Sequence, residues 1–187
     1  MKELGLALTS QGTTWFGVLV DSRDRLVASA FSEQRNAVEN HLSSYSKRIA
    51  GAGTRHVKNI FVEEMSMLFN GEKPKHKVSL NQDSVTNFQS SVYRVLSAIP
   101  KGRVTTYGQI ARKLKSGPRA VGNAVGSNPW PLFVPCHRVV PFNMTLGNYS
   151  TLEMHDRDGS GVKRTLLERE GVRFQGEKIL ATEIWNP

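Results

Sequence analysis

Residues 104–129, VTTYGQIARKLKSGPRAVGNAVGSNP, decide the fold of the second half of this chain. Thr106 and Gln109 have the spacing of a capping box, in which a hydroxyl and an amide side chain satisfy the free backbone N–H groups that open a helix. The stretch 115–117, Lys-Ser-Gly, then turns the chain, and Pro118 suits the first position of a second helix. Two short helices joined by a tight turn that contains glycine predict a helix-turn-helix unit.

The second of these helices has an unusual outward face. Its outward positions at helical spacing are Arg119, Gly122, Asn123 and Gly126. Each glycine inside a helix costs roughly 1 kcal/mol relative to alanine, so bare backbone must be useful there. Two uses are open: a close approach to DNA, such as in the narrow minor groove, or tight packing against another helix. Arg119 is the long cationic side chain placed to reach into a duplex.

The first half of the chain shows short apolar runs separated by turn residues. Residues 3–31 contain three such runs and predict a three-stranded antiparallel meander. Helices are expected over 34–50 and 56–70, the second ending at an Asn-Gly pair. The apolar stripe of that second helix is imperfect and consists of Ile60, Glu64, Met67 and Leu68. The charged, proline-containing stretch 72–77 is typical of a linker.

These patterns predict an α/β (α+β) protein with two domains. Residues 1–80 make a small α/β domain on a three-stranded antiparallel sheet, and residues 81–187 make a mainly helical domain that contains the helix-turn-helix. A further helix in the second domain, closed by Pro100 and Gly102, is indicated by apolar residues at helical spacing. They are Phe88, Val92, Val95, Leu96 and Ile99.

Charge and cysteine content narrow the class of protein. The net charge is +9, and residues 91–187 hold 14 Lys and Arg against 7 Asp and Glu. Such a basic half indicates either a polyanionic partner, nucleic acid first, or charge kept for solubility. One cysteine excludes an internal disulfide and fits a reducing compartment. The five histidines show no metal-ligand spacing, and no apolar run approaches the roughly 20 residues that cross a bilayer.

The single cysteine, Cys136, is followed directly by His137. A thiol reacts as thiolate, so a neighbouring base and positive charge would activate it. Because adjacent side chains on a strand point apart, a turn or a bridging water must connect the two residues. Glu170 falls in line with buried positions of a predicted helix that ends at Gly171, and a buried carboxylate needs a partner. That partner is either His137, giving a Cys–His–Glu relay, or a nearby arginine (169 or 173) or backbone N–H.

At this point the motifs resemble those of the O6-alkylguanine-DNA alkyltransferase (methylated-DNA–protein-cysteine methyltransferase) family, over about residues 86–174. The matching motifs are Thr106-Tyr107, Pro118-Arg-Ala-Val-Gly122, Asn128-Pro129, Pro135-Cys-His-Arg-Val-Val140, Gly147-Asn-Tyr-Ser150 and Lys163…Leu167…Glu170-Gly171. Residues 1–80 are similar only loosely to the ribonuclease-H-like N-terminal domain of these proteins. The sequence departs from the pattern after Ser150, where a longer charged loop covers 151–161.

The resemblance implies a role for each matching residue. Cys136 would accept the alkyl group, with His137 as base through a water and Glu170 orienting it, while Tyr107 would assist the leaving guanine. Arg119 would fill the gap left by a flipped nucleotide, on a helix that binds DNA through Gly122 and Asn123. Asn128 would be the hinge between this helix and the active-site turn. The base would be held by Tyr149, Ser150 and the backbone carbonyls of Cys136 and Val139.

The implied activity is direct reversal of DNA damage. An alkyl group would move irreversibly, once per molecule, from O6 of guanine to Cys136, with O4 of thymine left open as a second source. The expected partner is double-stranded DNA carrying O6-alkylguanine, bound by a monomer with no cofactor, no metal and no membrane. Such a protein would be cytoplasmic, or nuclear in a eukaryote. Three other readings stay open: a non-catalytic lesion binder, a helix-turn-helix regulator and a cysteine hydrolase.

Overall fold

The computed structural model describes residues 3–149 and 159–187, and the chain divides into two compact units. The first unit contains the chain up to Ser84 together with Pro129–Pro131. The second unit contains the rest of the described chain. In the described part of the chain, every helix is too short or too polar to cross a membrane.

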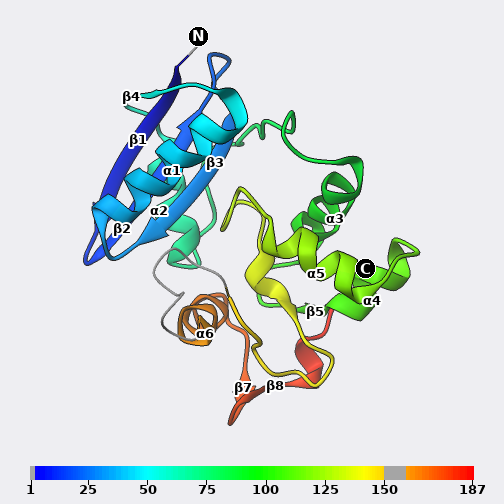
Figure 1. Cartoon of the computed structure of the whole chain (residues 1–187). Helices are drawn as coiled ribbons and strands as arrows, with labels where there is room; N and C mark the ends of the chain where they lie inside the picture. Colours follow the sequence, from blue (N-terminus) through cyan, green and yellow to red (C-terminus); the bar gives the residue numbers. More distant parts are fainter. Residues whose placement is uncertain (1–2, 150–158) are drawn as a thin grey trace. The chain divides into compact units, whose positions relative to one another are not determined.

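The first unit is built on a four-stranded sheet (Figure 1). Its strands are β1 (Leu4–Gln11), β2 (Thr14–Val20), β3 (Leu26–Ser32) and β4 (Thr54–His56), in the order β3-β2-β1-β4. The first three pair antiparallel, which confirms the predicted meander. The fourth strand pairs parallel to β1 and was not predicted. Its three residues, Thr-Arg-His, carry no apolar pattern that would mark a strand.

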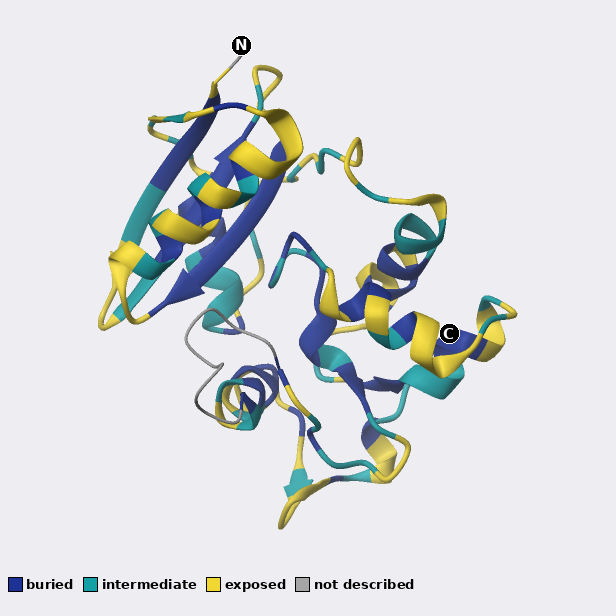
Figure 2. Cartoon of the chain, viewed as in Figure 1, coloured by how far each residue is buried: buried dark blue, intermediate teal, exposed yellow. Residues whose placement is uncertain are grey.

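Two helices cover opposite faces of this sheet. They are α1 (Arg35–Ala50) and α2 (Phe61–Phe69). A Cβ atom on Gly17 would lie 2.5 Å from Cγ1 of Val38, so glycine allows α1 to approach β2 closely. The neighbouring Phe16 points to the other face, where its ring meets Phe69 at a centroid distance of 5.3 Å. Helix α1 is buried along one side and exposed along the other (Figure 2).

Helix α2 differs from the prediction at its start and on its buried face. It begins five residues later than expected, because residues 54–56 belong to β4 and the Asn59 side chain accepts the Phe61 N–H at 2.9 Å. Ile60 is 45% exposed, so the predicted stripe was wrong at that position, whereas its Glu64 is buried. The residues that α2 buries are Phe61, Val62, Glu64 and Met65.

The sequence suggested that the stretch 72–77 is a linker, but in the structure it is bound to α2. The buried Glu64 carboxylate accepts the Lys75 backbone N–H at 2.7 Å and pairs with Nδ1 of His76 at 2.6 Å. These contacts tie the stretch to α2. In the chain, the first unit continues to Ser84.

The second unit is mainly helical, so the mixed fold class predicted from the sequence is confirmed (Figure 1). Its helices are α3 (Asn87–Ala98), α4 (Tyr107–Lys113), α5 (Pro118–Gly126) and α6 (Ser160–Arg169), with 3-10 turns at Cys136–Arg138 and Ala181–Glu183. Its short strands are β5 (Thr105–Thr106), β6 (Val139–Val140), β7 (Phe174–Gln175) and β8 (Lys178–Ile179).

The helix-turn-helix formed by α4 and α5 is confirmed, including its caps. The Thr106 hydroxyl accepts the Gln109 backbone N–H, and the Gln109 side chain accepts the Thr106 N–H at 2.8 Å. Pro118 occupies the first turn of α5. Helix α3 packs on α5 through a buried bond, in which the Tyr93 hydroxyl donates to the Ala124 carbonyl at 3.0 Å.

A two-strand parallel pair joins α4 to the segment that carries the cysteine. Thr105 pairs with Val139, and Thr106 pairs with Val140. Because the carboxyl ends of parallel strands lie at the same edge, Tyr107 at the start of α4 is close to the end of β6. This pairing brings residues separated by more than thirty positions to one place.

Candidate active site

Cys136 begins a 3-10 turn and is almost fully buried, with 9% of its surface exposed. Burial raises the pKa of its thiol, and a hydrogen bond from Asn128 and the charge of Lys163 only partly oppose that rise. The resting group is therefore a neutral thiol. Removing a thiolate from water costs more free energy than the hydrogen bond and the charge of these neighbours restore.

His137 lies in the same turn and is paired with Glu170, the residue that caps the C-terminal end of α6. The distance between Nε2 of His137 and Oε1 of Glu170 is 2.9 Å, and both side chains are buried. An ionised carboxylate only accepts hydrogen bonds, so Nε2 carries the proton and Nδ1 presents a lone pair. Nδ1 is buried and has no hydrogen-bond partner among residues 3–149 and 159–187. Burial lowers the pKa of His137, so its ring is neutral at neutral pH.

Arg138, which the sequence analysis did not single out, fixes the carboxylate. Its Nε and Nη2 donate to Oε2 and Oε1 of Glu170, each at 2.8 Å, and its Nη1 donates to the Ile99 carbonyl at 2.7 Å. Burial alone would raise the pKa of Glu170, but hydrogen bonds from His137 and Arg138 lower it to about 2. Of the two arginines considered as alternatives, Arg173 pairs instead with Glu183 at 2.6 Å.

Lys163 is a second residue that the sequence analysis did not place in the site. It is 1% exposed, and its Nζ donates to the Val139 carbonyl at 2.7 Å. Burial lowers its pKa from 10.5 to about 8, while Cys136 favours its charged form. The sequence signal for its burial was its helical spacing from Leu166 and Leu167 of α6 and from Glu170, which caps the helix, because all four residues are buried. The Val139 carbonyl, expected to bind guanine, thus already has one donor and keeps one lone pair.

The two tyrosines lie at different depths. Tyr107 is partly exposed at the start of α4, and burial together with the nearby Cys136 raises its pKa. Tyr149 is buried and meets the His137 ring edge-on at a centroid distance of 6.5 Å. Burial raises the pKa of Tyr149 well above its ordinary value. Ser150, the expected neighbour in the pocket, falls outside the described residues.

Asn128 lies between α5 and the cysteine turn. Its Nδ2 donates to the Val134 carbonyl at 2.9 Å, and its side chain also hydrogen-bonds Cys136. The same Val134 carbonyl accepts the Cys136 N–H at 2.8 Å. Asn128 therefore links the end of α5 directly to the backbone and the thiol of the nucleophile.

The outward face of α5 is open, as its composition suggested. Val121, Ala124 and Val125 are buried, whereas Arg119 and Asn123 are exposed. A Cβ atom added at Gly122 or Gly126 would meet nothing within 4 Å. Helix–helix packing in the described structure therefore does not explain these two glycines. They leave bare backbone on a surface, where a partner can approach.

Known proteins are similar to this chain in sequence and in fold. The family described as 6-O-methylguanine DNA methyltransferase, DNA binding domain, matches residues 87–172. A methylated-DNA–protein-cysteine methyltransferase of Thermococcus gammatolerans is 32% identical over 166 residues, covering 85% of this chain and 90% of that protein. The relative from Thermococcus sibiricus is 42% identical over 95 residues, and that alignment spans only half of each chain.

Solved structures extend the similarity to the fold. The O6-methylguanine-DNA methyltransferase of Pyrococcus kodakaraensis has a TM-score of 0.72 at 30% identity, covering 90% of this chain and 99% of that one. Mycobacterium tuberculosis OGT in complex with DNA has a TM-score of 0.67 at 27% identity, covering 89% and 92%. With a relative 32% identical across most of both chains, this protein belongs to the methylated-DNA–protein-cysteine methyltransferase family of DNA-repair proteins.

Proposed function

We propose that the protein removes an alkyl group from O6 of guanine in double-stranded DNA and keeps it on Sγ of Cys136. The observation that carries this proposal is the buried Cys136–His137 turn. Glu170 engages one imidazole nitrogen and leaves the other with a lone pair inside the protein. A saturated carbon on oxygen is attacked well by a soft sulfur nucleophile, and a neutral imidazole can take the thiol proton.

The proton and the alkyl group move in opposite directions. When the damaged base is in place, the Cys136 thiol passes its proton to Nδ1 of His137 through a bridging water. Sγ then forms a bond to the alkyl carbon, the bond from that carbon to O6 breaks, and its electron pair stays on guanine. The Tyr107 hydroxyl donates a proton to the departing base and regains one from the imidazolium. The products are a thioether and an unmodified guanine.

The surrounding charges favour the ionised intermediate. Glu170, which stays ionised because its pKa is about 2, stabilises the imidazolium, and Arg138 prevents the carboxylate from turning away. The charge of Lys163 favours the thiolate. In a buried site these interactions are stronger than in water and need no reorganisation during the reaction.

The helix-turn-helix is the proposed DNA-binding surface. A base inside a duplex cannot reach a buried sulfur, so the damaged nucleotide must leave the stack, at a cost of a few kcal/mol. In this proposal Arg119, which is exposed at the start of α5, enters the duplex and fills the gap. The bare backbone at Gly122 and Gly126 allows the helix to approach the groove.

A thioether has no easy route back to a thiol, so each molecule acts once. The test is a stoichiometric measurement, with duplex DNA carrying O6-methylguanine in excess over the protein. The number of guanines restored should rise to the number of protein molecules and then stop. Continued repair beyond that number would contradict single use, and no repair would contradict the proposed activity. The same titration with O4-methylthymine decides whether that base is a second source.

A further inference from the structure

Three residues between α5 and the nucleophile fold with the first unit, although the residues on both sides belong to the second. These residues are Pro129, Trp130 and Pro131. Three hydrogen bonds hold them to β3. The Ser29 N–H donates to the Pro129 carbonyl at 2.9 Å, the Ser29 hydroxyl donates to the Pro131 carbonyl at 3.0 Å, and the Trp130 indole N–H donates to the Leu26 carbonyl at 3.0 Å.

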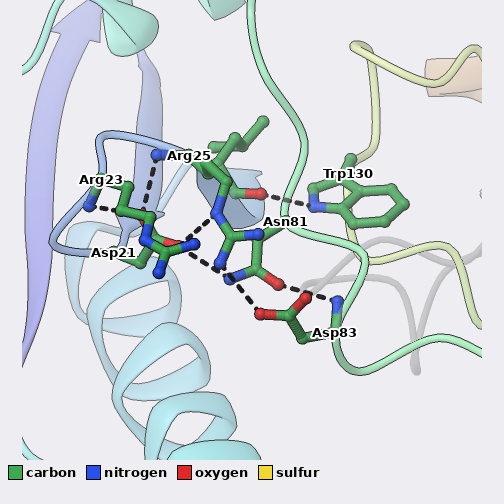
Figure 3. Close-up of polar contacts among 7 residues, drawn as sticks. Asp21, Arg23, Arg25, Asn81, Asp83 and Trp130 are labelled. Carbon is green, nitrogen blue, oxygen red and sulfur yellow. Dashed lines mark hydrogen bonds and ion pairs between the residues drawn. The ribbon is translucent and has the colours of Figure 1, made fainter.

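The acceptor for Trp130 belongs to a polar network that fixes the start of β3 (Figure 3). The Leu26 carbonyl also accepts the Asn81 backbone N–H at 2.8 Å. The Asn81 side chain donates to Asp21 at 2.9 Å, and Nε of Arg25 donates to the same carboxylate oxygen at 2.7 Å. Burial would raise the pKa of Asp21, but these hydrogen bonds and the backbone N–H groups lower it. The carboxylate therefore stays ionised and keeps its donors.

Residues that flank this tripeptide are hydrogen-bonded to each other within the second unit. The bond from Nδ2 of Asn128 to the Val134 carbonyl joins the two ends of a loop over 128–134, two residues before Cys136. Within this loop Leu132 is buried and has a φ of 73°. A branched side chain adopts this left-handed conformation only where its surroundings impose it. The loop is thus held at its tip and at its base.

We infer that Trp130 is a positioning residue for the alkyl transfer. Its indole N–H holds the tip of the 128–134 loop, and so keeps Asn128 and the backbone before Cys136 in the reactive arrangement. A purely packing role would need only an aromatic ring, whereas here the ring is 1% exposed and its N–H has a specific acceptor. Displacing a reacting group by about 1 Å can slow a reaction by about a hundredfold. This role, as a role in transfer, rests on the proposed function.

The test compares three full-length variants with the wild type. Trp130→Phe removes the N–H and keeps an aromatic ring, and Ser29→Ala removes a second hold on the same tripeptide. Ser46→Ala is the matched control, because it removes a buried hydrogen bond of the first unit, to the Ala52 carbonyl, that does not involve the loop. Two quantities are measured: the maximal rate of methyl transfer at saturating duplex, and the duplex concentration that gives half that rate.

In Trp130→Phe and Ser29→Ala the maximal rate should fall about two- to tenfold, the range that one lost hydrogen bond allows. The half-saturating concentration should not change, because the outward face of α5 is untouched. Ser46→Ala should keep the wild-type rate even where it melts at a lower temperature. Unchanged maximal rates in the first two variants, or an equal loss in Ser46→Ala, would overturn the positioning role. If Trp130→Phe does not fold, Ser29→Ala alone decides.

A second readout does not need activity. Amide hydrogen exchange over 132–136 should be faster in Trp130→Phe and Ser29→Ala than in the wild type and Ser46→Ala, because the loop opens more often. Equal exchange in all four proteins would overturn the inference. A wild-type protein that transfers no alkyl group would contradict the proposed function, whereas the exchange result would still decide whether Trp130 orders the loop.

Discussion

Arg138 and Glu170 are joined by two parallel hydrogen bonds of 2.8 Å, and the same carboxylate accepts Nε2–H of His137. A planar guanidinium that grips both oxygens leaves the carboxylate one orientation. The arrangement sets the tautomer of His137 and keeps its other nitrogen available for the thiol proton.

Glu170→Gln should slow methyl transfer and shift its pH dependence. In the wild type the rate should stay level down to the ordinary histidine pKa of about 6.5 and fall only below it, because burial lowers the pKa of His137. Glu170 raises that pKa, so its loss should move the acid limb to still lower pH while the rate at neutral pH falls. Single-turnover rates across pH give both quantities. An identical profile in the variant would remove Glu170 from the relay.

Glu170 should also contribute to stability in a defined pH range. Its pKa is lowered from 4.5 to about 2 in the folded protein. At about 1.4 kcal/mol for each pKa unit, this is roughly 3 kcal/mol of unfolding free energy. The contribution is complete above pH 4.5, the unshifted value, and is lost as the pH falls toward 2. Denaturant unfolding of the wild type and Glu170→Gln should show a difference that narrows over this range. A constant difference would contradict the lowered pKa.

Gly122→Ala should change stability and DNA binding in opposite directions. The added methyl group meets open space, so the free protein should become more stable by up to about 1 kcal/mol. If the groove approaches the backbone at this position, the same methyl group should weaken binding to duplex DNA. Thermal melting and a duplex titration measure the two effects. Stronger or equal binding would show that the glycine serves no close approach to DNA.

Arg119→Ala should impair repair only where a base must leave a duplex. Transfer from duplex DNA should fall roughly tenfold or more, because extruding a base costs a few kcal/mol that the side chain helps to offset. Reaction with free O6-benzylguanine should keep its rate, since no base is flipped. Arg48→Ala, at an exposed position of α1 in the first unit, is the control and should leave both rates unchanged. Equal losses on both substrates would contradict the role of Arg119.

The sequence predicted those parts of the fold that local patterns specify. The capping box at Thr106, the proline that opens α5 and the turns of the meander each depend on residues within a few positions of one another, and the structure confirms them. Strand β4 was missed because its pairing with β1 is a long-range event that its polar residues do not announce. The start of α2 was predicted too early because residue 56 belongs to this unpredicted strand.

The residues of the site could be predicted only where they belong to a recognisable motif. Cys136, His137 and Glu170 could be proposed from spacing and family motifs, and the structure brings the three together. Arg138 and Lys163 were not assigned, because long cationic side chains are usually solvent-exposed. Nothing in the sequence marks Arg138 as buried, and the helical spacing of Lys163 from Leu166 and Glu170 was the one available sign of its burial. The hydrogen bond from Trp130 goes to a strand about a hundred residues earlier in the chain, so only the folded structure reveals it.

The most direct test of the account is to locate the transferred group. After incubation with duplex DNA carrying O6-methylguanine, the protein is digested and the peptide that contains Cys136 is sequenced by mass spectrometry. The account predicts one added methyl group on Cys136 of the wild type and none anywhere in Cys136→Ser. Methylation at another residue, or restored guanine with Cys136 unmodified, would contradict it.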